Sequence, residues 1–155
     1  MPHVPTTTNP NDWHRFFAIE TNNRAWLLAG RRRSQAEDEE MLSNAHASLL
    51  HWTETGTELN RQRALMLLAH VHALVGLGAS ALVYAREMRA YFIANETDDW
   101  EIAFTHTIYA HASYAAGDMD SHKIAHDHAR QAIEDIADPE DRDMVQTTFD
   151  QVPVP

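Results

Sequence analysis

The sequence predicts an all-α protein, an α-α superhelix of three helical hairpins followed by a C-terminal capping helix. Apolar residues recur with helical spacing along almost the whole chain, and the alternation typical of strands is nearly absent. Short breaks separate the predicted helices, so sequential helices should be antiparallel neighbours. The chain has 155 residues and a 44% hydrophobic fraction, which suits one domain. We expect a flexible tail at residues 1–8, a single domain at 9–152 and a frayed tail at 153–155.

The first hairpin is marked by two helix-start patterns. Asn9 stands before a proline, an arrangement that suits an N-cap followed by the first helical turn. The helix that begins there should end near Gly30. Ser34 and Glu37 form a capping-box pattern, which predicts the start of a second helix. This second helix should end near Gly56.

The later helices follow from the same kinds of signal. The third predicted helix is apolar around much of its circumference, which is typical of a helix buried between neighbours. Glycine breaks and acidic caps divide the rest of the chain. The expected elements run from about Glu58 to Val75, from Gly78 to about Asn95, from Asp99 to Gly117, from about Asp120, and from Asp138.

A short sequence pattern that occurs twice supports a repeated structure. Ala69–His70 lies seven residues before Gly76, and Ala110–His111 lies seven residues before Gly117, a shift of 41 residues. A small residue on the first helix of a hairpin lets the second helix pack closely. Ala69 and Ala110 are candidates for that role.

A longer pattern runs roughly from Trp26 to Asp143, and its most specific part is Ala45-His46-Ala47-Ser48, His51-Trp52, Gly56 and Leu59-Asn60-Arg61. This pattern resembles that of a family of small bacterial proteins with a tetratricopeptide-like fold. The resemblance implies the fold and no activity. The repeat spacing is nearer 40 residues than the 34 of a strict tetratricopeptide repeat, so the peptide-groove residues of such repeats are not carried over.

The composition excludes several classes of protein. Without cysteine there are no disulfides, no zinc–thiolate sites and no thiol catalysis. The net charge of −11 and the lack of a basic stripe argue against nucleic-acid binding. No apolar run is long enough for a signal peptide or a membrane span, so we expect a cytoplasmic protein with no membrane partner. Arg31, Arg32 and Arg33 are expected to face the end of the first helix and the acidic run 37–40, not a bound anion.

The leading functional hypothesis is a non-enzymatic module that binds a protein or peptide on the concave face of the array. The first helices of the hairpins should line that face, and His70 and His111 occupy equivalent positions on two of them. The predicted partner-binding residues are Arg61, Arg63, His70, His106, His111 and Tyr114. The alternative is that these histidines are buried groups satisfied by the backbone. A homodimer formed through an apolar helix face is a further expectation.

A second hypothesis is a histidine-dependent metal-binding protein or metallohydrolase. His122 and His126 are four residues apart on one helix and can bind one divalent transition metal together, with Asp118 or Asp120 as an oxygen ligand. The competing interpretation is a solvated helix face. No catalytic motif is present, and the leading hypothesis needs no cofactor. The eleven histidines also suggest a third possibility, an interaction that responds to pH.

Overall fold

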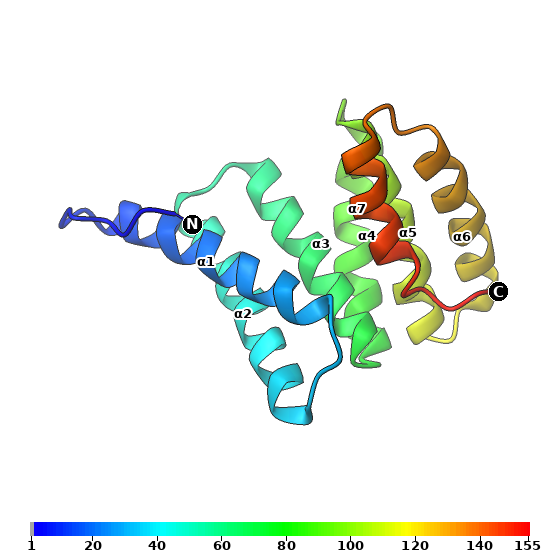
Figure 1. Ribbon diagram of the computed structural model, residues 1–155, viewed down its shortest axis with the longest axis horizontal. Coiled ribbons are helices and arrows are strands. Elements are labelled where there is room, and N and C mark those ends of the chain that lie inside the picture. Colours follow the sequence, from blue (N-terminus) through cyan, green and yellow to red (C-terminus); the bar gives the residue numbers. More distant parts are fainter. Residues whose placement is uncertain (1) are drawn as a thin grey trace.

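The computed structural model describes residues 2–155 and contains seven helices within them (Figure 1). They pack as sequential antiparallel pairs, so the predicted all-α hairpin array is confirmed. The helices are α1 (Pro10–Ala29), α2 (Gln35–Thr55), α3 (Glu58–Leu74), α4 (Gly78–Ala94), α5 (Asp99–Ala115), α6 (Met119–Glu134) and α7 (Pro139–Phe149).

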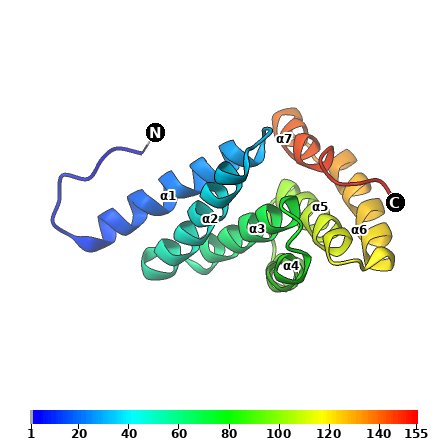
Figure 2. The same cartoon turned by 90° about the horizontal axis from the view of Figure 1, so that it is seen from below.

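The helices form two layers. Each helix packs on the next one along the chain, and α3 also packs on α1 and α5, while α5 packs on α7. Each odd-numbered helix therefore packs on the next odd-numbered one, as Figure 2 shows from below. The N-terminal half of α1 projects away from the remainder of the array, and the helices nearest to it there are α2 and the start of α3. Within residues 2–155, no helix is long and apolar enough to cross a membrane.

The helix starts agree with the capping patterns of the sequence. The side chain of Asn9 accepts a hydrogen bond from the Asn11 amide at 3.1 Å. Ser34 and Glu37 form both bonds of a capping box, at 3.3 and 2.9 Å. Both starts were predicted, because a cap depends only on a few adjacent residues and the orphan amides of the first turn.

The pattern that recurs after 41 residues corresponds to two helices that end in the same way. Gly76 and Gly117 are the two glycines with positive φ, 78° and 80°, among the described residues. The amide of Leu77 bonds to the His72 carbonyl at 2.9 Å, and the amide of Asp118 bonds to the Ser113 carbonyl at 2.9 Å. These are the 6→1 hydrogen bonds of two Schellman motifs, which satisfy carbonyls at the ends of α3 and α5.

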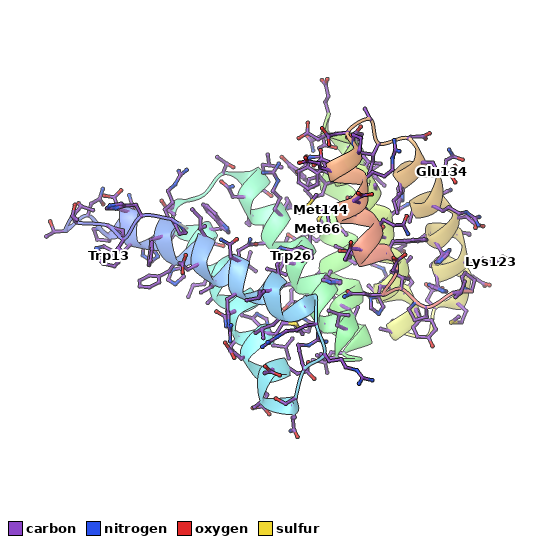
Figure 3. The ribbon with its side chains drawn as sticks, viewed as in Figure 1. Trp13, Trp26, Met66, Lys123, Glu134 and Met144 are labelled. Carbon is purple, nitrogen blue, oxygen red and sulfur yellow. The ribbon has the colours of Figure 1, made fainter. Side chains whose placement is uncertain are left out.

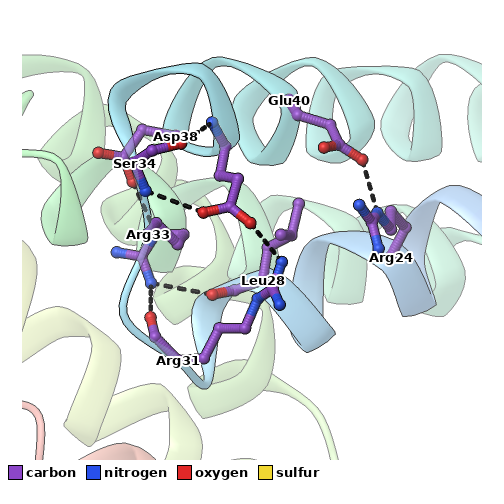
Figure 4. Close-up of polar contacts among 8 residues, drawn as sticks. Arg24, Leu28, Arg31, Arg33, Ser34, Asp38 and Glu40 are labelled. Atoms are coloured by element: carbon purple, nitrogen blue, oxygen red, sulfur yellow. Dashed lines mark hydrogen bonds and ion pairs between the residues drawn. The ribbon is translucent and has the colours of Figure 1, made fainter.

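The arginine cluster after α1 closes the first hairpin (Figure 4). Arg33 donates to Asp38 at 2.6 Å and to the carbonyl of Leu28 at 2.9 Å, and Arg31 pairs with Glu37 at 2.5 Å. Two of the three arginines thus join the end of α1 to the start of α2. This is the structural role that the sequence indicated, since the last carbonyls of a helix attract cations.

Candidate functional site

A cavity of about 370 Å³ lies where the four odd-numbered helices converge. Each of these helices contributes two lining side chains: Asn22 and Trp26 from α1, Arg63 and Met66 from α3, Trp100 and Phe104 from α5, and Met144 and Thr148 from α7. Figure 3 shows Trp26, Met66 and Met144 grouped between α1, α3 and α7. The volume of the cavity is within the range of natural ligand pockets, and the cavity is lined mainly by aromatic rings and methionine thioethers.

The aromatic rings of this cavity are fixed by contacts with each other. Trp26 stacks on His70 with a centroid distance of 5.2 Å and an interplanar angle of 26°. Phe104 lies 5.8 Å from Trp26 and 6.0 Å from Trp100, with the second pair edge to face. Such geometries are favourable for rings. The wall is therefore a connected aromatic surface that spans α1, α3 and α5.

The one basic residue that lines the cavity is neutralised within the chain. The Nε of Arg63 donates to Glu101 at 2.6 Å, and the guanidinium carbon lies 5.3 Å from the centre of the Trp100 ring. Glu101 is 2% exposed and also accepts from the Asp98 amide at 3.3 Å. A buried carboxylate needs such a partner, so Arg63 is held in place by both its charge and its stacking.

A second cavity, of about 330 Å³, adjoins the first. The two share Trp26, Met144 and Thr148 as lining residues. His70 and Gln151 belong to the second one, and the Gln151 side chain donates to the Ala29 carbonyl at 3.1 Å. Together the two cavities form a groove along α7, which we call the aromatic groove.

His70 forms part of the groove wall as a neutral ring. Its side chain is almost completely buried, and its Nδ1 has no hydrogen-bond partner within residues 2–155. Burial lowers the pKa of His70 to about 3, and the nearby His111 and Arg33 add to this effect. At neutral pH the ring therefore acts as a flat, uncharged surface behind Trp26.

The structure brings together three of the six predicted partner-binding residues. Arg63 and His70 line the aromatic groove, and His111 lies behind His70 with ring centroids 6.3 Å apart. Both histidines are buried as the alternative interpretation expected, but the Nδ1 of His111 also has no partner within the described residues. Burial lowers the pKa of His111 to about 4.

The other three predicted residues lie away from the groove. Arg61 pairs with Glu58 and with Glu87 of α4, at 3.1 and 2.7 Å, so its guanidinium forms an ion pair that joins α3 to α4. His106 lines a separate cavity of about 140 Å³ with His128. Tyr114 is 42% exposed. Its ring lies 5.2 Å from that of His122. Positions two residues apart on a helix point about 200° away from each other, and this separates Arg61 from Arg63.

The proposed metal ligands His122 and His126 are buried, so the interpretation of this side of α6 as a solvated face is wrong. They are 0% and 8% exposed, because α5 and α7 cover them. Their rings lie 5.8 Å apart, and the Nδ1 of His122 is 2.9 Å from the Ala110 carbonyl. Across residues 2–155, no three potential ligands of the His, Cys, Asp and Glu types are grouped for a metal ion.

Ten of the eleven histidines lie beside another histidine. Four pairs connect two helices and one lies within α6, with ring centroids between 5.1 and 6.3 Å apart. The pairs are His14–His51, His46–His72, His70–His111, His106–His128 and His122–His126. Histidine is therefore a recurring contact residue between the helices, a pattern that sequence spacing did not reveal.

The main groove residues were not identified as site candidates from the sequence. Trp26, Met66, Trp100, Phe104 and Met144 have the helical spacing of core residues, and nothing in their spacing marks them as a cavity lining. The available signal was that large apolar side chains recur on each first helix. It does not separate a filled core from a groove.

The chain matches no protein-family model, no curated protein and no solved structure. The seven-helix architecture and the geometry of the aromatic groove are thus the observations from which a function can be inferred.

Proposed function

We propose that this protein is an interaction module that binds a segment of another protein in the aromatic groove. The observation that carries this proposal is the cavity of about 370 Å³ walled by Trp26, Met66, Trp100, Phe104 and Met144. Met144 is 44% exposed, so apolar surface is accessible at the mouth of the cavity. A large apolar side chain fits a pocket of this size and chemistry, as an anchor residue does at many interfaces.

A peptide segment suits the groove better than a compact ligand. The adjoining cavity extends the groove along α7 past Thr148 to Gln151, so the apolar surface is elongated. The lining offers few polar groups to orient a small molecule, because Arg63 is already paired with Glu101. An amphipathic helix that places its apolar face in such a groove is a common mode of recognition. The resemblance to tetratricopeptide-like proteins agrees with this use of the first-helix layer.

Peptide selection followed by a matched pair of variants tests the proposal. A displayed library of random peptides of about 16 residues, roughly four helical turns, is selected against the full chain. Peptides that bind are then measured by fluorescence anisotropy against Met144→Ser and Met119→Ser. The two methionines are 44% and 47% exposed, but only Met144 lines the groove. We expect Met144→Ser to weaken binding about tenfold, the loss of one buried anchor contact, and Met119→Ser to leave it unchanged.

The control variant also defines the contrary result. If no peptide is enriched, or if Met119→Ser weakens binding as much as Met144→Ser does, the aromatic groove is not the binding site.

A further inference from the structure

A cluster of carboxylates borders one end of the aromatic groove, at the starts of α5 and α7. We call Asp98, Asp99, Asp138, Glu140 and Asp141 the acidic margin. A hydrogen bond of 2.9 Å from the Ala137 amide to Asp99 ties the loop before α7 to the start of α5.

These carboxylates also influence one another electrostatically. The pKa of Asp141 is raised by desolvation and then by the charges of Asp138, Asp99, Asp98 and Glu140. A like charge nearby disfavours ionisation, so the carboxylates act on one another through space.

The acidic margin is adjacent to the mouth of the cavity. Asp99 directly precedes Trp100, which lines the cavity. On α7, Met144 follows Asp141 by three residues and Glu140 by four, so all three lie on one side of the helix. The distance along α7 from the carboxylates to the thioether is therefore about one helical turn, roughly 5 Å.

The basic residues of this region do not balance the margin. Arg142 is the basic residue of α7, and its guanidinium donates to the Ile136 carbonyl. Arg63 is paired with Glu101 across the cavity wall. The margin therefore presents five carboxylates beside an apolar cavity whose own ion pair is neutral.

From these observations we propose that the segment bound in the groove is cationic and amphipathic, with an apolar anchor in the cavity and lysine or arginine over the acidic margin. This inference rests on the proposed function. The spacing on α7 places the cation of a helical partner about one turn, three or four residues, from its anchor. A second copy of this chain is disfavoured as the occupant, because two molecules of net charge −11 repel each other.

A biased peptide library tests the charge preference directly. Peptides of about 16 residues carry a fixed central leucine, and the other positions encode lysine, glutamate or serine with equal frequency. After selection on the full chain, we expect lysine to exceed glutamate by about threefold or more at three and four residues from the leucine. This enrichment corresponds to the modest energy of a charge pair at a solvated interface.

Charge-neutralising variants then locate the effect on the molecule. Glu140→Gln/Asp141→Asn removes two charges of the margin, whereas Glu39→Gln/Asp120→Asn removes two exposed charges elsewhere. Both variants change the net charge by the same amount and keep the shapes of the side chains. We expect the margin variant to weaken binding of a selected lysine peptide about three- to tenfold, with a smaller effect of the control. Thermal unfolding of each variant shows whether its fold is intact.

The outcomes separate the two proposals. If the selected peptides depend on Met144 but show no lysine preference, or if both double variants weaken binding equally, the cationic partner is refuted while the interaction module stands. If no peptide binds in a Met144-dependent way, the interaction module fails and the present inference fails with it.

Discussion

Gly78 shows how one residue controls the contact between two hairpins. It is buried at the start of α4, where the backbone at the end of α5 passes directly against it. A Cβ at this position would lie 2.1 Å from the carbonyl oxygen of Ala115 and 2.4 Å from the amide nitrogen of Ala116. The obstacle is backbone, which cannot rotate away as a flexible side chain does. Glycine is required here for close approach, not for an unusual φ.

We therefore expect Gly78→Ala to lower the free energy of unfolding by about 1–3 kcal/mol, the usual cost of overpacking a tight contact. Urea denaturation monitored by circular dichroism measures the change. Gly30→Ala is the matched control, because the Cβ there would meet its nearest neighbour at an ordinary 3.7 Å. That variant should be neutral or slightly stabilising. Equal effects of the two substitutions would show that the turns do not touch as described.

At the scale of the elements, histidine pairs connect α1 to α2, α2 to α3, α3 to α5 and α5 to α6. Protonation of both members of a buried pair such as His70–His111 would place two like charges close together in a poorly hydrated contact. Burial and the neighbouring His128 and Arg89 lower the pKa of His106 to about 4. His111 has a similarly lowered pKa, through burial and His122, and the pKa of His70 is lowered further. The surroundings of His70, His106 and His111 therefore favour neutral rings.

The stability of the fold should consequently fall in mild acid. The folded pKa values of His70, His106 and His111 lie below the ordinary value of 6.5, so the unfolded chain binds more protons as the pH falls. The stability is fully present above about pH 7 and declines as the pH drops from 6.5 towards 4. Each of these groups contributes up to about 1.4 kcal/mol per pH unit in that window. Urea unfolding at a series of pH values measures the total.

Two histidine variants locate this effect. His106→Gln removes one of the three groups and should make the pH dependence less steep, by up to about one proton. His3→Gln changes a residue of the N-terminal tail that lies outside the five pairs, so it should leave the slope unchanged. An unfolding midpoint that stays constant between pH 7 and pH 5 would contradict the role assigned to the pairs.

At the scale of the whole molecule, the net charge is −11 when all eleven histidines are neutral, and it becomes less negative as they are protonated. Their protonation would bring the formal charge to zero, and the sequence pI is about 5.3. Mutual repulsion keeps highly charged proteins apart in solution, and it vanishes near the isoelectric point. The loss of repulsion falls in the same pH range as the loss of stability.

We expect the folded protein to have a solubility minimum somewhat below the sequence pI of 5.3 at low salt, because His70, His106 and His111 are still neutral at that pH. Light scattering during a titration from pH 7.5 down to about pH 4 measures the association, and circular dichroism on the same samples separates native association from unfolding. Scattering that does not rise through this range would show that net charge is not what keeps the chains apart.

Local signals explain why the helices were predictable and why the groove was not. Asn9, Ser34 and the glycines at 76 and 117 act on backbone groups within a few residues of themselves, so their effects can be recognised in the sequence. The side chains of Trp26 and Met144 lie far apart in the chain and meet through the packing of α1 and α7 on α3 and α5.

The histidines show the same division. The sequence placed His122 and His126 on one side of a helix, which is correct, but whether α5 or water covers that side depends on tertiary packing. Arg61 and Arg63 are two residues apart and similar in sequence context, yet one pairs with α4 and the other with α5. A rotation of 100° per residue sends them to different neighbours.

The sequence by itself thus determined the helices, their ends, the hairpin order and the strongly acidic charge, because these depend on local hydrogen bonds, periodicity and composition. The tertiary structure alone decided which apolar residues remain accessible as a groove, which arginine lines it and which histidines meet. Those properties depend on the angles and distances between helices, and side chains distant in the sequence set them jointly.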